Sequence, residues 1–111
     1  MALLFRPEHV EPILQGVKTE TRRLWQRPRV RVGAVHRAKL RMLSPDHFAL
    51  LRITGLRQER LRQISDEDAG WEGGYTRETF LDKWFEIHPR SPDDPPVWVV
   101  EFAVAGRPDA D

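Results

Sequence analysis

The chain is organised around the stretch Gly16-Val17-Lys18-Thr19-Glu20-Thr21-Arg22-Arg23, which follows a short helical pattern and opens a strand-like run. Strand alternation predicts that Lys18, Glu20 and Arg22 share one face and that the intervening residues share the other. A bulge near Gly16 would bring Lys18 and Thr21 to a single cleft. The stretch is therefore either an exposed polar edge strand or a site that holds an anion or a base.

Length and composition limit the classes of protein that this chain can represent. At 111 residues, with 40% hydrophobic residues, it is predicted to form one domain with one modest core over residues 1–105 and a frayed tail at 106–111. It has no cysteine, which excludes disulfides and thiolate metal sites. The four histidines are scattered without ligand spacing, so we predict no metal and no cofactor.

The same composition predicts where the protein works. The apolar run that begins the chain is too short and uncharged for a signal peptide, and no apolar run approaches the length of a membrane span. We therefore expect a soluble cytoplasmic protein with no membrane partner. The sequence leaves the oligomeric state open.

Charge is unevenly distributed along the chain, although the net charge is only +1. No acid occurs between Glu20 and Asp46, and this interval carries Arg22, Arg23, Arg27, Arg29, Arg31, Arg37, Lys39 and Arg41. Arginine outnumbers lysine heavily there, and its planar fork matches phosphate oxygens. The interval is either a solvated surface or, as we favour, a face that meets a phosphate-bearing partner.

Periodicity and turn signals predict an α+β fold. Strands are expected at residues 2–5, 19–24, 34–42, 47–56 and 97–105, with a bulge at Gly55, and residues 57–62 either extend the fourth strand or leave it. Capping patterns predict a short helix that ends at Gly16, a short second helix after Ser65 that Gly70, Gly73 and Gly74 break, and a third after Thr76. This order favours a small mixed or antiparallel β-barrel of about five or six strands, closed at its ends by two or three short helices.

Aromatic residues have both a structural and a functional interpretation. The apolar stripe Phe80, Leu81, Trp84, Phe85 and Ile87 on the third helix is predicted to be core. Trp25 stands beside Arg27 and Arg29 in a predicted loop. It either closes the core or stacks on a base, as aromatic platforms for single strands do.

Two motifs in order give the chain a resemblance to a known family. The stretch from Gly16 to Arg23 resembles the signature of the ASCH (activating signal cointegrator homology) family, and Asp68-Ala69-Gly70-Trp71-Glu72-Gly73 resembles a second family segment. The helix around Phe80 and the final strand Val97-Trp98-Val99-Val100-Glu101-Phe102 fit as well, so the resemblance covers nearly the whole chain. It implies a PUA-like β-barrel whose cleft, beside the first helix, binds RNA or nucleotides.

The resemblance also implies a possible chemistry. One bacterial branch of the family hydrolyses 4-acetylcytidine with a lysine, a threonine and a glutamate, which fall on Lys18, Thr21 and Glu72 here. Thr21 would be the nucleophile, Lys18 its base with a pKa lowered by burial and neighbouring arginines, and Glu72 the acid for the leaving amine. Arg23 would stabilise an oxyanion. Arg22 stands where that branch has an apolar residue.

A binder would use the same cleft without chemistry. A base would lie among Lys18, Thr21 and Glu72 and stack on Trp71 or Tyr75. The flanking RNA would be held by the remaining candidate contacts Arg22, Arg23, Trp25, Arg27, Arg29 and Arg31. We place RNA or nucleotide binding first because the arginine-rich segment suits a polyanion, with the amidohydrolase as an alternative and a protein-interaction module as a second alternative.

Overall fold

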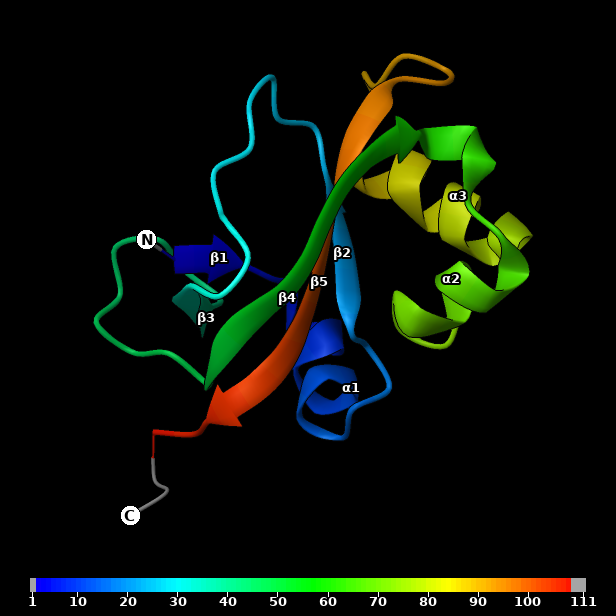
Figure 1. Ribbon diagram of the computed structural model, residues 1–111. Coiled ribbons are helices and arrows are strands. Elements are labelled where there is room, and N and C mark those ends of the chain that lie inside the picture. Colours follow the sequence, from blue (N-terminus) through cyan, green and yellow to red (C-terminus); the bar gives the residue numbers. More distant parts are fainter. Residues whose placement is uncertain (1, 109–111) are drawn as a thin grey trace.

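Five strands form one mixed sheet in a computed structural model that describes residues 2–108. The strands are β1 (Ala2–Leu4), β2 (Glu20–Arg23), β3 (Val35–Lys39), β4 (Ala49–Arg60) and β5 (Pro96–Gly106), in the spatial order β1-β3-β4-β5-β2 (Figure 1). β1 pairs with β3 in parallel, and the other pairs are antiparallel. The expected strands are all present, and β4 continues past the expected Leu56 because β5 pairs with it as far as Arg60↔Pro96.

The long strands β4 and β5 hold the molecule together. Their antiparallel ladder shifts register between Ile53 and Gly55, which confirms the predicted bulge. A Cβ at Gly55 would stand 2.5 Å from a carboxylate oxygen of Glu101, so glycine lets this side chain cross the strand. Gly106, predicted to begin the tail, closes β5, and residues 109–111 lie outside the described part of the chain.

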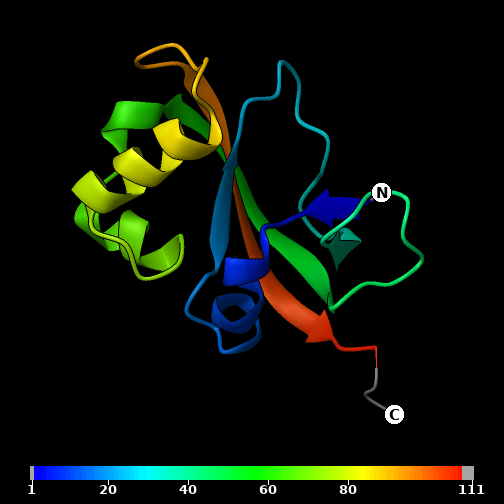
Figure 2. The same cartoon turned by 180° about the vertical axis from the view of Figure 1, so that it is seen from behind.

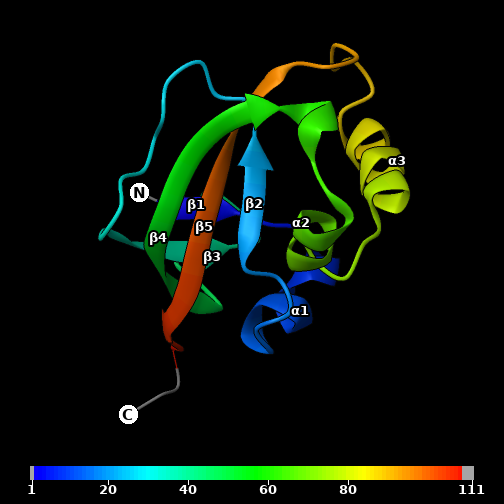
Figure 3. The same ribbon diagram turned by 45° about the vertical axis from the view of Figure 1, so that its right-hand side comes forward.

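Helices lie beside the β2 edge of this sheet (Figures 1 and 3). The first helical stretch is η1 (Pro7–His9) with α1 (Val10–Leu14), η2 (Leu61–Gln63) follows β4, and α2 (Asp66–Trp71) and α3 (Arg77–Ile87) precede β5. Ser65 and Thr76 cap α2 and α3 as predicted, each accepting a backbone N–H bond on its hydroxyl. α2 continues through Gly70, and the chain turns only at Gly73 and Gly74, which adopt positive φ.

Two apolar clusters stabilise the two ends of the sheet. One contains Phe5, Ile13, Leu51 and Phe102 and fills the space enclosed by β1, β3, β4 and β5. The other contains Leu61, Phe80, Leu81 and Trp84 and packs α2 and α3 against the far ends of β4 and β5. Phe80, Leu81 and Trp84 are thus core, as expected, whereas Phe85 is only partly buried.

The sheet curls until its two edge strands approach each other. No backbone ladder joins β1 to β2 among residues 2–108, but Arg23 Nη2 at the end of β2 donates to the carbonyl of Leu4, at the end of β1, at 2.7 Å. The five strands and three α-helices confirm a small α+β fold of the predicted kind. No helix within residues 2–108 is both long enough and apolar enough to cross a membrane.

Candidate functional site

A cavity of about 180 Å³ lies between β2, η1, the turn after α2, and α3. Figure 2 shows this side of the molecule, with β2 in front, the η1–α1 segment below it and α3 beside it. The cavity is lined by Leu4, Phe5, Arg6, His9, Lys18, Thr21, Arg22, Arg23, Leu24, Glu72, Tyr75, Phe80, Lys83, Trp84, Ile87 and His88. The first and second sequence motifs therefore meet at one place.

Strand alternation in β2 separates its side chains into two sets, as predicted. Arg22 Nη1 donates to Glu20 at 2.7 Å, and Arg23 Nε donates to the Thr21 hydroxyl at 3.2 Å. Each bond joins residues i and i+2, which lie on the same face of a strand. The two neighbouring arginines are therefore held by different groups on opposite faces.

Lys18 is buried at the boundary between these two sets. Its ammonium donates to the carbonyl of Glu20 at 2.9 Å, to the carbonyl of Glu72 at 2.8 Å and to Glu72 Oε1 at 3.0 Å. Burial lowers the pKa of Lys18, and the adjacent Glu72 carboxylate opposes this shift. Because an ammonium has three N–H groups and all three have acceptors here, the geometry suits the charged amine.

Glu72 and Arg22 continue this set of ion pairs along the cavity wall. Glu72 Oε2 accepts from Arg22 Nη1 at 2.8 Å, so the carboxylate lies between two cations. Arg22 Nη2 also donates to Glu59 at 2.6 Å. Burial acts to lower the pKa of Arg22, but Glu72, Glu20 and Glu59 outweigh it and raise that pKa above its usual value. We name Lys18, Glu20, Arg22, Glu59 and Glu72 the paired cluster.

Arg23 faces the cavity without such partners. Its guanidinium donates to Thr21 and Leu4, lies 5.0 Å from the centre of the Phe5 ring, and has no carboxylate within 4.0 Å among the described residues. Burial lowers its pKa to about 10, which still leaves it charged at neutral pH. The Thr21 hydroxyl accepts from Arg23 and donates to no described residue. Both groups can therefore donate to an acceptor in the cavity.

Aromatic rings form the rest of the wall. Tyr75 stands edge-on to both His9 and Phe80, with ring centres 6.2 and 5.9 Å apart, and the Trp84 and His88 rings are 4.3 Å apart. His9 Nε2 and the Tyr75 hydroxyl share a hydrogen bond of 3.0 Å. Burial lowers the pKa of His9 to about 4, and the charge of Lys18 adds to this shift, so the ring is neutral at physiological pH. Flat apolar surfaces with a few convergent donors suit a planar polar ligand.

Comparison with solved structures identifies this architecture, whereas no family model and no curated protein sequence matches the chain. The ASCH domain from Lactobacillus crispatus JV V101 is 17% identical, with a TM-score of 0.63 over 88% of this chain and 70% of that one. The ASCH protein from Zymomonas mobilis is 13% identical, with a TM-score of 0.63 over 91% of this chain and 64% of that one.

The chain has the fold of an ASCH domain. A protein from Enterococcus faecalis V583 assigned to the DUF984 family shares it, with 18% identity and a TM-score of 0.65 over 92% of this chain and 72% of that one. At these identities the likeness concerns the fold alone.

This ASCH fold brings together some of the candidate residues and separates others. Lys18, Thr21, Arg22, Arg23, Glu72 and Tyr75 line the cavity. Trp25 is partly buried against the core, Trp71 is exposed, and neither lines the cavity; Arg27, Arg29 and Arg31 are exposed on the loop beyond β2. Arg22, expected to hold a phosphate, has a fully buried side chain committed to carboxylates, so this geometry gives it a structural part instead.

Several cavity residues escaped the sequence argument. Phe80 and Trp84 are core residues, as predicted, but each also presents part of its surface to the cavity. His9 and His88 are far apart in sequence and belong to no motif. Each stands at the end of a helix, and the fold brings both ends to the cavity beside β2. Within residues 2–108, no group of His, Asp or Glu side chains is arranged to hold a metal ion.

Proposed function

We propose that this cavity binds a single nucleobase, presented by RNA or by a nucleotide. The observation that carries the proposal is Arg23, a charged donor that faces an aromatic-walled cavity without a carboxylate partner. A guanidinium in such surroundings is stabilised by an acceptor supplied by a ligand.

The size of the cavity limits what can enter it. Its volume of about 180 Å³ is below the ~300–1,000 Å³ typical of sites that enclose a whole drug-sized ligand. One ring system fits this space, and the attached sugar and phosphates would remain outside. The exposed arginines of the loop after β2, among them Arg27 and Arg29, are the candidate phosphate contacts.

The lining also supports base recognition in chemical terms. Arg23 and Thr21 would donate to a carbonyl oxygen of the base, while the rings of Tyr75, Phe80 and Trp84 would contact its faces. Single-stranded RNA is read by this combination of stacking and hydrogen bonds to exposed base edges. The proposal agrees with the cytoplasmic location expected from the sequence.

Calorimetric titration of the purified protein with nucleosides, including 4-acetylcytidine, tests the proposal. The wild type should bind at least one of them, and Arg23→Gln should bind it about 10- to 100-fold more weakly, since a hydrogen bond to a charged donor contributes about 1.5–3 kcal/mol. Arg60→Gln, a change of the same charge on the far end of β4, is the control and should bind like the wild type. If the folded wild type binds no nucleoside and no RNA, the protein-interaction alternative is favoured.

An amidohydrolase is the second candidate, because Lys18, Thr21 and Glu72 all line one cavity. The hydrogen bonds of Lys18 and Glu72 support binding over hydrolysis. Lys18 donates to three acceptors and no hydrogen bond joins it to Thr21, while both oxygens of Glu72 accept from cations. A base needs a free electron pair and an acid needs a proton to give, and these contacts supply neither in the unliganded chain.

Release of acetate from 4-acetylcytidine separates the two functions. A hydrolase should release acetate in the wild type, retain part of its rate in Thr21→Ser and lose it in Lys18→Arg, which keeps the charge but cannot serve as a base. A binder should bind the nucleoside and release no acetate. Binding without turnover over hours, in a protein whose fold is intact by circular dichroism, would reject this hydrolase activity.

A further inference from the structure

The exposed apolar side chains of this chain gather around the β3–β4 hairpin. Nine large apolar residues are exposed within residues 2–108, and five of them lie between positions 32 and 43: Val32, Val35, Leu40, Met42 and Leu43. Leu43 is the most exposed of the nine, at 97%. Single exposed apolar residues are ordinary, but several at one place mark a surface that another molecule covers.

The loop between β3 and β4 holds three of these side chains outward. Phe48 N–H donates to the carbonyl of Ala38 at 3.0 Å and closes the base of the loop. At the tip, Ser44 N–H donates to the carbonyl of Arg41 at 3.4 Å. The loop is therefore held at its base and at its tip, and it leaves Leu43 in solvent and not against the core.

Cations alternate with these apolar side chains along the hairpin. Arg37, Lys39 and Arg41 have no carboxylate within 4.0 Å among the described residues. Asp46 is the one acid in the sequence over residues 21–58. The hairpin therefore combines apolar side chains with a positive charge that its own acids do not balance.

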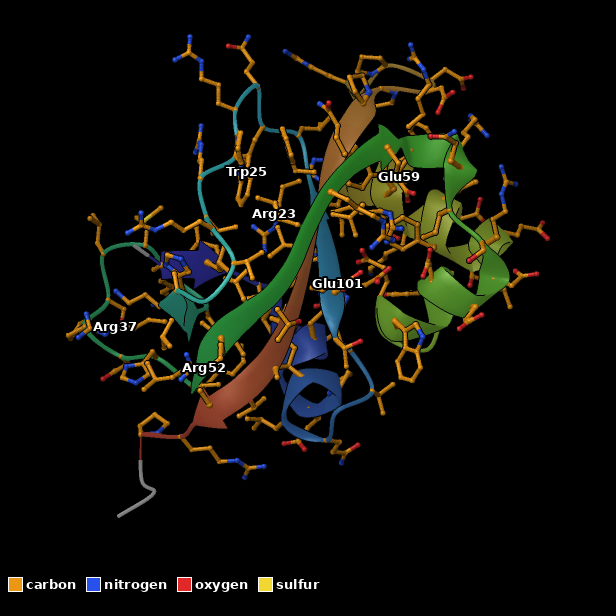
Figure 4. The ribbon with its side chains drawn as sticks, in the orientation of Figure 1. Arg23, Trp25, Arg37, Arg52, Glu59 and Glu101 are labelled. Atoms are coloured by element: carbon orange, nitrogen blue, oxygen red, sulfur yellow. The ribbon has the colours of Figure 1, made fainter. Side chains whose placement is uncertain are left out.

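The same mixture continues onto the sheet beside the loop. Val35 lies opposite Arg52 in the β3–β4 ladder, and Arg37 lies opposite Leu50. Both pairs are on one side of the sheet, because residues i and i+2 of a strand share a face. Figure 4 shows Arg37 and Arg52 at the β3 end of the molecule, away from α2 and α3. We give the name hairpin surface to Val35, Arg37, Lys39, Leu40, Arg41, Met42, Leu43 and Arg52.

The composition of the hairpin surface distinguishes between partners. Its charge opposes a two-fold contact with a second copy, because like charges would face each other across the axis. Nucleic acid would use the arginines and not the aliphatic side chains, since bases stack on aromatic rings and residues 37–46 contain none. An anionic lipid surface uses both, because its phosphates accept from arginine and its acyl chains cover aliphatic groups.

We propose that the hairpin surface binds an anionic membrane, with Leu40, Met42 and Leu43 at the boundary between headgroups and acyl chains. The cations of the surface would contact lipid phosphates. The sequence predicted no membrane partner because it has no apolar run of membrane length, but a contact at the lipid surface requires none. No residue of the hairpin surface lines the cavity, so this inference is independent of the proposed function.

The experiment is co-sedimentation of the protein with two kinds of lipid vesicle. One kind consists of phosphatidylcholine, which carries no net charge, and the other of phosphatidylcholine mixed with anionic phosphatidylglycerol. Met42→Ser/Leu43→Ser removes apolar surface from the hairpin and keeps its charge. Arg37→Gln/Arg41→Gln removes charge and keeps the apolar side chains.

Each double variant has a matched control. Val17→Ser/Val104→Ser replaces two exposed apolar residues outside the hairpin surface. Arg60→Gln/Arg77→Gln removes two exposed arginines outside it, whose guanidiniums donate to backbone carbonyls. All of these positions are exposed, so the variants should fold, which circular dichroism checks.

The wild type should sediment with the anionic vesicles and remain in solution with the neutral ones. Met42→Ser/Leu43→Ser should bind the anionic vesicles about tenfold more weakly, because less apolar surface leaves water. Arg37→Gln/Arg41→Gln should bind about fivefold more weakly for each charge removed, and its binding should depend less on salt. Both controls should bind like the wild type.

Three results would overturn the inference. If the wild type remains in solution with both kinds of vesicle, an anionic membrane is not the partner, and an acidic protein takes its place as the candidate. If Met42→Ser/Leu43→Ser binds anionic vesicles as the wild type does, the apolar side chains take no part in the contact. If either control weakens binding as much as its matched variant, the hairpin surface is not where the vesicle binds.

Discussion

Arg22 and Arg23 are adjacent in β2, yet their surroundings are opposite. Arg22 is fully buried and contacts the carboxylates of Glu20, Glu59 and Glu72, whereas Arg23 has no carboxylate partner and faces the cavity. The first arrangement holds α2 and β4 to β2, and the second leaves donors available. The side of the strand on which each arginine lies therefore decides whether its charge meets carboxylates or faces the cavity.

The largest expected effect is the loss of the paired cluster. Arg22→Met leaves Glu20, Glu59 and Glu72 without their shared cation and should lower the free energy of unfolding by about 3–5 kcal/mol. Arg23→Met removes a cation with no carboxylate to compensate, and should cost less than about 1.5 kcal/mol. Urea unfolding measures both, and equal losses would contradict the distinction between the two arginines.

A double-mutant cycle tests whether Lys18 belongs to the paired cluster. Lys18→Met and Glu72→Gln should each destabilise the fold by about 2–4 kcal/mol, because each leaves buried polar groups without a partner. The double variant should cost less than the sum, with a coupling energy of about 1–3 kcal/mol. Additive losses would mean that Lys18 and Glu72 contribute independently.

The free energy of unfolding should depend on pH through His9, which is stabilised as a neutral ring in the cavity wall. The pKa of His9 falls from 6.5 to about 4 in the folded chain, so the unfolded chain binds the proton first. This stabilisation is complete above pH 6.5 and is lost as the pH falls toward 4, by about 1–2 kcal/mol after allowance for the partial exposure of the ring. His9→Gln, which keeps a nitrogen near Tyr75, should lack this loss in urea unfolding followed across that pH range. His47→Gln should retain it.

The smallest effect on stability is expected at Thr21. Its hydroxyl donates to no described residue, so Thr21→Val should change the free energy of unfolding by about 1 kcal/mol or less. If the hydroxyl donates to the base, nucleoside affinity should fall by about three- to tenfold. Unchanged affinity, in a variant that unfolds like the wild type, would leave Arg23 as the donor that matters.

Local sequence signals predicted most of the elements. Short segments encode the caps at Ser65 and Thr76, the bulge at Gly55 and the β-branched final strand, so these features can be predicted from local sequence alone. The end of β4 could not be predicted in this way, because its last residues have little strand character and are held by pairing with β5. Alternation also separated Arg22 from Arg23.

The site was harder to predict because its groups come from distant parts of the chain. Strand geometry near Gly16 suggested one cleft for Lys18 and Thr21, but Glu72 joined them only through the resemblance to a family. The structure places all three on one cavity. No local pattern around Arg22 predicted that the distant residues Glu59 and Glu72 would contact it. His9, which lies beside Tyr75, became a candidate only when the helices were positioned.

The order of the strands has a consequence for how the protein is made. β5 lies between β4 and β2 and pairs with both, so β2 waits for a partner more than seventy residues later in the chain, as in Glu20↔Glu101. Such non-local pairing must precede closure of the cavity wall that β2 provides. During synthesis β2 therefore remains without its partner strand for most of the chain's length, and the cavity wall that β2 provides can form only after residues 98–101 of β5 have been made.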